Sequence, residues 1–213
     1  MTVTAAFNRR LLKPRSGNSY RGCPKGWMVQ PKVNDHRVAI LMNPDGDMMV
    51  FNNEGTLYSK MWWRDTANMD AFKSELMDFF TEHFNADSEW PWLVDAGVMG
   101  PAYGKGPATL IIHDIPRSKD IMKKRYAILA NWFPVWMSSE DNHESPFGDI
   151  MITPTWDKSV MPVMWKHMQD QNTKLGYNCY EGFVCKDPLS KYPFTTSKRK
   201  FPKWIKYRFD QLN

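Results

Sequence analysis

Residues 38–51 contain a turn sequence between two short apolar runs. Residues 38–42 and 47–51 are rich in Val, Ile, Met and Phe, and Asn43-Pro44-Asp45-Gly46 lies between them. A turn of this kind between apolar runs predicts a β-hairpin. Because a hairpin pairs its strands antiparallel, the fold must contain a sheet that is at least partly antiparallel.

Further strand and helix signals follow along the chain. Helices are predicted at residues 68–84, 118–133 and 157–175, and strands at 109–115, 148–153, 182–185 and 203–209. The last helix has Pro162 near its first turn, where proline is tolerated, and Gly176 after it as a stop signal. Since strands outnumber helices, the predicted fold class is α+β with antiparallel sheets, not a parallel doubly wound sheet.

The composition excludes a disordered chain and a membrane-spanning one. Apolar residues make up 42% of the 213 residues, with ten Trp and twelve Phe, which suits one folded domain. The longest apolar runs are the length of strands, far below the ~20 residues that span a bilayer. We also expect no secretory signal. Three Cys without CxxC spacing indicate reduced cytosolic thiols, and the five His form no zinc motif.

Positive charge is concentrated at both ends of the chain. Residues 1–37 carry a net charge of +7, residues 186–208 carry +7, residues 38–185 carry −8 and residues 209–213 carry −1, for a total of +5. This pattern predicts an anionic partner on a surface built from both ends, although charge runs also occur as ordinary solvated faces. In the last predicted strand, Lys206 and Arg208 share one face with Trp204, which suits an anionic ligand.

The sequence around Lys32 resembles the nucleophile motif of covalent nucleotidyltransferases, the superfamily of ATP-dependent DNA ligases, RNA ligases and mRNA capping enzymes. That motif reads Lys-x-Asp-Gly-x-Arg; Lys32 and Arg37 match it, while Asn34 and Asp35 replace Asp-Gly. Four further stretches follow in the family's order, at residues 93–97, 110–115, 181–186 (Glu-Gly-Phe-Val-Cys-Lys) and 204–208 (Trp-Ile-Lys-Tyr-Arg). The resemblance therefore covers nearly the whole chain.

This resemblance implies an α+β, ATP-grasp-like nucleotidyltransferase domain with two antiparallel β-sheets flanked by helices. It implies a single adenylation domain over residues 1–213, with a basic N-terminal arm at residues 1–25. Family ligases normally continue into an OB-fold domain, and we expect none here. Among the departures from the family pattern, Asp35 stands where the first motif has glycine, and Gly97 stands where the third motif has glutamate.

The resemblance also implies a role for each matched residue. Lys32 would attack the α-phosphorus of a nucleotide in its neutral form, which the positive field of Lys206 and Arg208 would favour. Glu181 and Asp95 would hold a metal ion, because Mg²⁺ binds one or two carboxylates together with substrate phosphates. The nucleotide would be bound by Gln30 (adenine edge), Arg37 (sugar or nucleic-acid phosphate), His113 (purine face), Glu181 and Lys186.

Each of these residues also has a plainer interpretation. Lys32 could be a surface lysine and Glu181 a salt-bridged strand end. Asp95 could cap a turn, and His113 could be a satisfied core histidine. Strict alternation places Glu181 and Lys186 on opposite faces of one strand, so one of them must lie at a strand end or beyond a β-bulge.

The predicted function is an ATP-dependent DNA ligase that seals nicks through a lysyl-AMP intermediate, in replication or repair, with ATP and Mg²⁺ or Mn²⁺ as cofactors. We expect a monomer in the cytoplasm, or in the host cytoplasm if the protein is viral, with no membrane partner. The alternatives are an RNA ligase, a capping guanylyltransferase that uses GTP, or a weakened nucleic-acid-binding relative. The expected partner is nicked duplex DNA, or else RNA, contacted by Arg9, Arg10, Lys13, Arg15, Lys198, Arg199 and Lys200.

Overall fold

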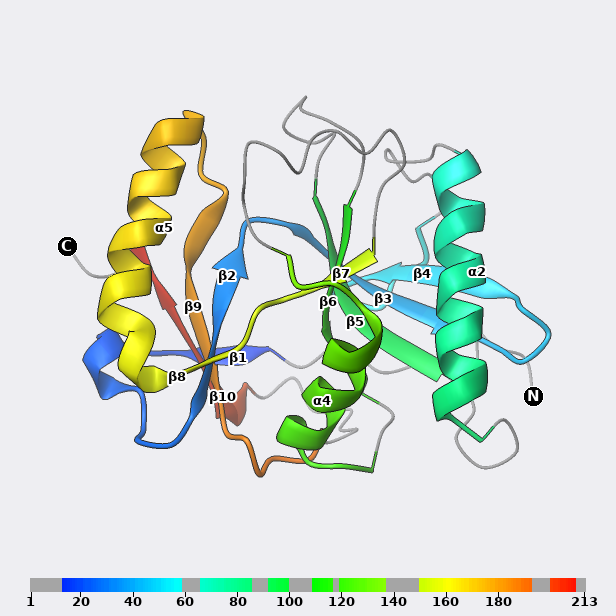
Figure 1. Ribbon diagram of the computed structural model, residues 1–213, viewed down its shortest axis with the longest axis horizontal. Coiled ribbons are helices and arrows are strands. Elements are labelled where there is room, and N and C mark those ends of the chain that lie inside the picture. Colours follow the sequence, from blue (N-terminus) through cyan, green and yellow to red (C-terminus); the bar gives the residue numbers. More distant parts are fainter. Residues whose placement is uncertain are drawn as a thin grey trace.

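The computed structural model describes residues 13–58, 66–85, 92–99, 109–116, 119–136, 150–192 and 200–209. These ranges form two five-stranded β-sheets and three α-helices (Figure 1). None of these helices is long and apolar enough to cross a membrane. The α+β class predicted from the sequence is confirmed.

The first sheet joins strands from both ends of the described chain. Its strand order is β1-β10-β9-β2-β8. The bounds are β1 (Pro14–Ser16), β2 (Met28–Val33), β8 (Trp156–Asp157), β9 (Tyr180–Lys186) and β10 (Phe201–Arg208). Because β1 pairs with β10, the described parts of the two basic ends lie side by side, which agrees with the charge pattern.

The second sheet contains the predicted hairpin and has the order β4-β3-β5-β6-β7. Its strands are β3 (His36–Met42), β4 (Met48–Asn52), β5 (Trp92–Met99), β6 (Thr109–Asp114) and β7 (Ile150–Ile152). The hairpin turn is closed by Asn43, whose side chain accepts a hydrogen bond from the Asp47 backbone N–H at 2.7 Å. Gly46 supplies a positive φ of 82° in this turn, a conformation that glycine adopts without steric cost.

Both sheets are mainly antiparallel, but each has one parallel pair at an edge. Strand β1 runs parallel to β10, and β7 runs parallel to β6. Each of these edge strands has three residues. Such short strands carry too little alternating pattern to reveal their direction, so the sequence predicted purely antiparallel sheets.

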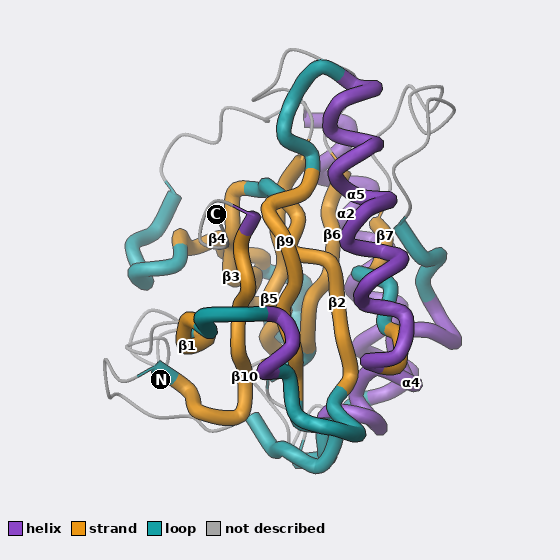
Figure 2. Tube along the Cα trace, turned by 90° about the vertical axis from the view of Figure 1, so that its left-hand side faces the viewer, coloured by secondary structure: helices purple, strands orange, loops and turns teal. Residues whose placement is uncertain are grey.

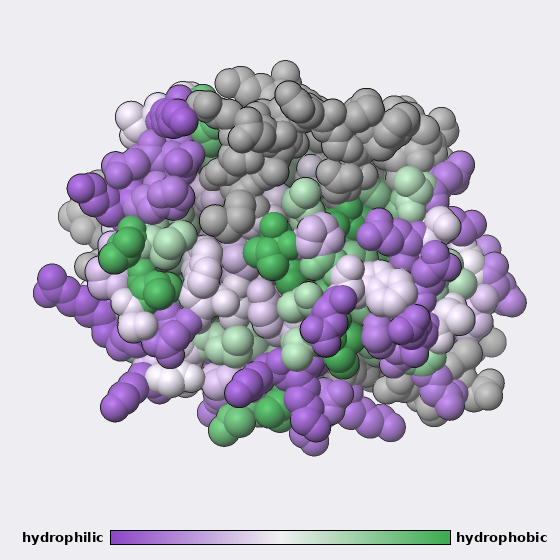
Figure 3. Space-filling view, in the orientation of Figure 1, coloured by the Kyte–Doolittle hydropathy of each residue, from purple (hydrophilic) through white to green (hydrophobic). Residues whose placement is uncertain are grey.

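The helices pack where their apolar spacing requires a sheet beneath them. Helices α2 (Thr66–His83) and α4 (Met122–Trp132) cover the second sheet, and α5 (Met161–Leu175) covers the first. In Figure 2 all three lie on the same side of the strands. Figure 3 shows mostly hydrophilic side chains over α5 and α2, as expected for helices with one buried face. On α2 the buried residues that face the sheet are Phe72, Leu76, Phe79 and Phe80.

The ends of α5 follow the proline and glycine signals in the sequence. Pro162 lies in the first turn, and Gly176 ends the helix with a left-handed φ of 71°. The predicted start at residue 157 is four residues early, because residues 158–160 form a 3₁₀ turn. Asp157 caps this turn, since its side chain accepts a hydrogen bond from the Ser159 N–H at 2.8 Å.

Candidate active site

The chain crosses from the first sheet to the second at Asn34 and Asp35, and a cavity of about 530 Å³ lies at this crossing. Every residue that the sequence predicted for catalysis, nucleotide binding or metal binding lines this cavity. These residues are Gln30, Lys32, Arg37, Asp95, His113, Glu181, Lys186, Lys206 and Arg208. Positions 178 residues apart in sequence, from 30 to 208, therefore form one site.

Strand β2 presents its polar residues to the cavity because its apolar residues are held by α5. Val29 and Val33 are buried in the core that contains α5 residues. Gln30 and Lys32 therefore point to the opposite face, where they line the cavity. Gln30 is buried, and its side-chain N–H donates to the Thr155 hydroxyl at 2.8 Å.

Glu181 lies between two cations from the neighbouring strands. Its carboxylate forms ion pairs with Lys32 of β2 and, at 3.2 Å, with Arg208 of β10. Both cations lie opposite Gly182 in the strand register, one on each side of β9. Glu181 is therefore salt-bridged, as its plainer interpretation held, and at the same time lies beside the predicted nucleophile.

A β-bulge brings Glu181 and Lys186 into the same cavity. The pairing of β2 with β9 shifts between Lys32 and Val33, so that Glu181 is the extra residue. Gly182 follows it with a φ of 138°, and a Cβ atom there would overlap the carbonyl oxygen of Tyr207. This bulge resolves the alternation conflict in the sequence, because it moves Glu181 to the face that Lys186 occupies.

The cations around Glu181 act on one another. Burial lowers the pKa of Lys206 below its ordinary value, and the charges of Arg208 and Lys32 lower it further. Within the described residues, the Nε atom of Arg208 is buried and has no hydrogen-bond partner. Lys32, Lys206 and Arg208 line the same end of the cavity, and their combined positive charge suits an anion.

Lys186 is the most deeply buried cation of the site. It is 2% exposed, its Nζ donates to the carbonyl oxygen of His113 at 2.9 Å, and it lies 4.4 Å from the centroid of the Trp204 ring. Burial lowers the pKa of Lys186 to about 8, although the charges of Asp114 and Asp95 oppose that change. Lys186 therefore loses its proton far more readily than a surface lysine.

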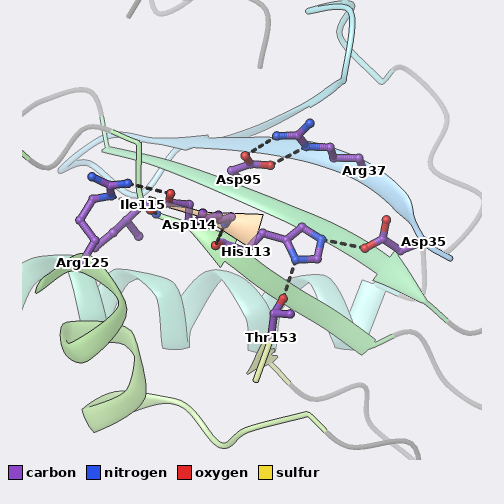
Figure 4. Close-up of polar contacts among 9 residues, drawn as sticks. Asp35, Arg37, Asp95, His113, Asp114, Ile115, Arg125 and Thr153 are labelled. Carbon is purple, nitrogen blue, oxygen red and sulfur yellow. Dashed lines mark hydrogen bonds and ion pairs between the residues drawn. The ribbon is translucent and has the colours of Figure 1, made fainter. Parts of the chain in front are cut away.

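Arg37 and Asp95 form a two-point ion pair from β3 to β5. The Arg37 Nε and Nη2 groups donate to the two Asp95 oxygens at 2.8 and 2.6 Å (Figure 4). Burial alone would lower the pKa of Arg37, but the charge and hydrogen bonds of Asp95 raise it above its ordinary value. Because both oxygens of Asp95 accept from Arg37, its contacts do not favour the metal-ligand role, which stays a prediction. The turn-cap alternative is wrong, since Asp95 lies within β5.

His113 is part of a polar chain that the sequence did not reveal. Its ring nitrogens lie 2.7 Å from Asp35 Oδ2 and 2.6 Å from the Thr153 hydroxyl (Figure 4). The imidazole therefore lines the cavity, as predicted for a nucleotide-binding residue, and both of its nitrogens have hydrogen-bond partners, as predicted for a satisfied core histidine. Asp35 was visible only as a departure from a motif, and Thr153 carried no signal of its own.

A second missed pair, Asp114 and Arg125, joins β6 to α4. Both side chains are buried, and Arg125 Nε and Nη2 donate to the two Asp114 oxygens at 2.7 and 2.9 Å. Burial would raise the pKa of Asp114, but the charge of Arg125 lowers it below the ordinary range. This pair anchors the helix beside the strand that carries His113, so it supports the site from outside the cavity.

The predicted nucleic-acid contacts are only partly described. Arg9, Arg10, Lys198 and Arg199 lie outside the described residues. Lys13 lines the cavity and forms an ion pair with Glu54. Arg15 and Lys200 are exposed near the β1–β10 edge. Of the described part of the N-terminal arm, Pro14–Ser16 is held in the first sheet as β1.

Comparisons with known proteins support the fold. No family model matches the sequence, and the comparison with curated proteins found no match. The structure is similar to the ligase domain of M. tuberculosis LigD, with 13% identity and a TM-score of 0.59 over 98% of this chain and 61% of that one. It is also similar to Chlorella virus DNA ligase-adenylate (11% identity, TM-score 0.54, 94% of this chain and 67% of that one).

An archaeal ATP-dependent RNA ligase is similar as well (17% identity, TM-score 0.53, 95% of this chain and 49% of that one). The chain therefore spans about three fifths of the M. tuberculosis ligase domain and about half of the archaeal RNA ligase. At these identities the likeness is one of fold. With the motif order and the cavity described above, it shows that this chain has the nucleotidyltransferase-domain fold of ATP-dependent ligases.

Proposed function

We propose that this chain is the catalytic domain of an ATP-dependent polynucleotide ligase and that Lys32 carries AMP as a covalent intermediate. The observation that carries the proposal is the arrangement of Lys32, Lys206 and Arg208 around Glu181 in one cavity. Binding of a triphosphate requires several cations, and transfer of AMP requires a nucleophilic amine within the length of one nucleotide. This cavity supplies both.

In the proposed reaction, Lys32 Nζ attacks the α-phosphorus of ATP, a P–N bond forms, and the bond to pyrophosphate breaks. The amine must lose a proton to attack, and Glu181, its ion-pair partner, is placed to receive it. Lys206 and Arg208 stabilise the charge that develops on the phosphates as pyrophosphate leaves. AMP then passes to a 5′-phosphate, and a 3′-hydroxyl displaces it to seal the strand.

A metal ion fits this site through Glu181. The described residues contain no cluster of three or more His, Cys, Asp or Glu side chains that could hold a metal. Mg²⁺ commonly needs only one or two protein carboxylates when phosphates supply the other ligands, and Glu181 meets that requirement. Mg²⁺ or Mn²⁺ would neutralise charge on the triphosphate.

We propose nicked duplex DNA as the substrate, gripped by the basic surface where β1 and β10 meet. Phosphate contacts of this kind hold a strand without reading its sequence, so they favour no base. RNA is the second candidate, because an archaeal RNA ligase is among the similar structures. Sealing of matched nicked DNA and nicked RNA duplexes by the same preparation distinguishes the two.

The covalent intermediate is the direct test of the reaction. Incubation with α-labelled ATP or GTP and Mg²⁺, followed by a denaturing gel, should label the wild-type protein with ATP alone. Lys32→Ala should lose the label completely and keep its fold, whereas the matched variant Lys166→Ala, at an exposed position on α5, should keep both. A wild-type protein without label, or a labelled Lys32→Ala variant, would refute the assignment, and labelling by GTP would indicate a capping enzyme.

A further inference from the structure

Gly97 is a glycine because another side chain occupies the space where its own would be. A Cβ atom at position 97 would overlap the carboxylate of Asp35 and lie 2.8 Å from the Asp35 Cβ. Gly97 is not among the glycines with positive φ in the described chain, so its backbone could accept an ordinary residue. Gly97 is paired in the β3–β5 register with Arg37, which follows Asp35 by two residues. Space, not conformation, requires glycine here.

Asp35 and Gly97 are also two of the positions at which the motifs depart from the family pattern. The first motif has an acid where glycine is usual, and the third has glycine where an acid is usual. The structure places these departures in contact. The carboxylate of Asp35 therefore enters this wall of the cavity from the turn between β2 and β3, in place of the carboxylate that a glutamate at position 97 of β5 would supply.

The hydrogen-bond partners of His113 can accommodate a charged ring. The Thr153 hydroxyl lies 2.6 Å from His113 Nδ1 and 3.3 Å from the Ile112 carbonyl oxygen. When the hydroxyl donates its proton to this carbonyl oxygen, it accepts a hydrogen bond from His113 Nδ1–H. The Asp35 carboxylate accepts from the other ring nitrogen at 2.7 Å. When both nitrogens donate, the ring is an imidazolium cation.

Asp35 is suited to this task because it stays ionised. Burial would raise its pKa, but the charge and hydrogen bond of His113, followed by the charges of Lys32 and Arg37, lower it below the ordinary value. The carboxylate is 9% exposed and His113 is 18% exposed, so the pair is largely shielded from water and from salt.

We propose that Asp35 is a positioning residue that keeps His113 as an imidazolium on the cavity wall, where its face recognises a purine base, and that Asp35 and Gly97 form a matched pair. This inference rests on the proposed function, because the base belongs to the nucleotide. With both N–H groups engaged, His113 has no donor left for a base edge. Its positive face can still bind an electron-rich purine by a cation–π contact.

The charge test uses Asp35→Asn, which keeps the size of the side chain. At about pH 7, ¹⁵N NMR of the wild-type imidazole should show two protonated nitrogens, and Asp35→Asn should show one. Dissociation constants for ATP should rise about tenfold in the variant, the size of a lost cation–π contact. Asp45→Asn, in an exposed turn away from the cavity, is the control and should change neither quantity. A neutral His113 in the wild type, or unchanged ATP binding in Asp35→Asn, would overturn the role of Asp35.

The packing test measures whether the two positions depend on each other. Gly97→Ala alone should lower the unfolding midpoint in denaturant. Combined with Asp35→Gly, which clears the space, the same change should cost much less. Asp35→Ala would not relieve the overlap, because its Cβ would still lie 2.8 Å away. Gly22→Ala is the control, since a Cβ there meets only the Tyr207 hydroxyl at 3.8 Å.

Additive effects of Gly97→Ala and Asp35→Gly would show that the positions are not a matched pair. These measurements of ring protonation and stability need no ligase activity. They are therefore independent of the Lys32 labelling test, and they can still be interpreted if the proposed function is wrong. If Lys32 is labelled but His113 is neutral and the effects of Gly97→Ala and Asp35→Gly are additive, this inference fails and the proposed function stands.

Discussion

Replacing Lys186 with Met should change how the stability of the protein depends on pH. Lys186 is 2% exposed and its pKa falls from the ordinary 10.5 to about 8, mainly because burial disfavours the charged form. Met has a similar length, carries no charge and suits the contact with the Trp204 ring, which lies 4.4 Å from the Lys186 Nζ. The variant therefore removes the titration with little change in volume.

The magnitude follows from the difference between the folded and unfolded forms. A fall from 10.5 to about 8 corresponds to about 3 kcal/mol of unfolding free energy, which opposes folding while Lys186 is charged in both states. Below about pH 8 this penalty is complete. Between 8 and 10.5 only the unfolded chain keeps the proton, so the free energy of unfolding rises with pH. From about pH 7 to about pH 10, Lys186 should contribute a gain of about 2 kcal/mol.

The assay is denaturant unfolding at several pH values from about 7 to 10, under reducing conditions, for the wild type and Lys186→Met. Other groups titrate alike in both proteins, so the difference between the two stabilities isolates Lys186. This difference should shift by about 2 kcal/mol in favour of the wild type as the pH rises. Lys166→Met, at an exposed position on α5, should give a constant difference. A constant difference for Lys186→Met as well would refute the buried-charge reasoning.

Three further changes probe the pair at Asp95, the bulge and the basic edge. Arg37→Ala should lower the free energy of unfolding by about 3–5 kcal/mol, because it leaves the fully buried Asp95 carboxylate unpaired. Chemical denaturation measures this loss, and a smaller loss would mean that water replaces the guanidinium. Gly182→Ala should prevent close pairing with β10 and reduce soluble, folded protein in a thermal melt; an unchanged melting temperature would contradict the overlap with Tyr207. Binding to nicked DNA should weaken with salt by a log–log slope of roughly −0.9 per phosphate contacted, and Lys13→Ala with Arg15→Ala should flatten that slope in a filter-binding titration, whereas an equal slope would place the duplex elsewhere.

Local patterns in the sequence were enough to place most elements and to order the site along the chain. The turn at 43–46 specified the β3–β4 hairpin, and Gly176 marked the end of α5, because both depend on a few adjacent residues. The conflict between Glu181 and Lys186 required a strand end or a bulge, since side chains alternate along any strand, and the structure has the bulge. Motif order then predicted which residues share one cavity.

The partners of those residues depend on strand register, which local patterns do not encode. Asp95 accepts from Arg37, 58 positions earlier, because β3 and β5 are neighbours. Asp35 reaches His113, 78 positions later, because its side chain occupies the space that a side chain at position 97 would otherwise fill. A side chain's contacts are decided by which strands lie next to it and by the space they leave. In this protein the space left at Gly97 lets the carboxylate of Asp35 reach His113.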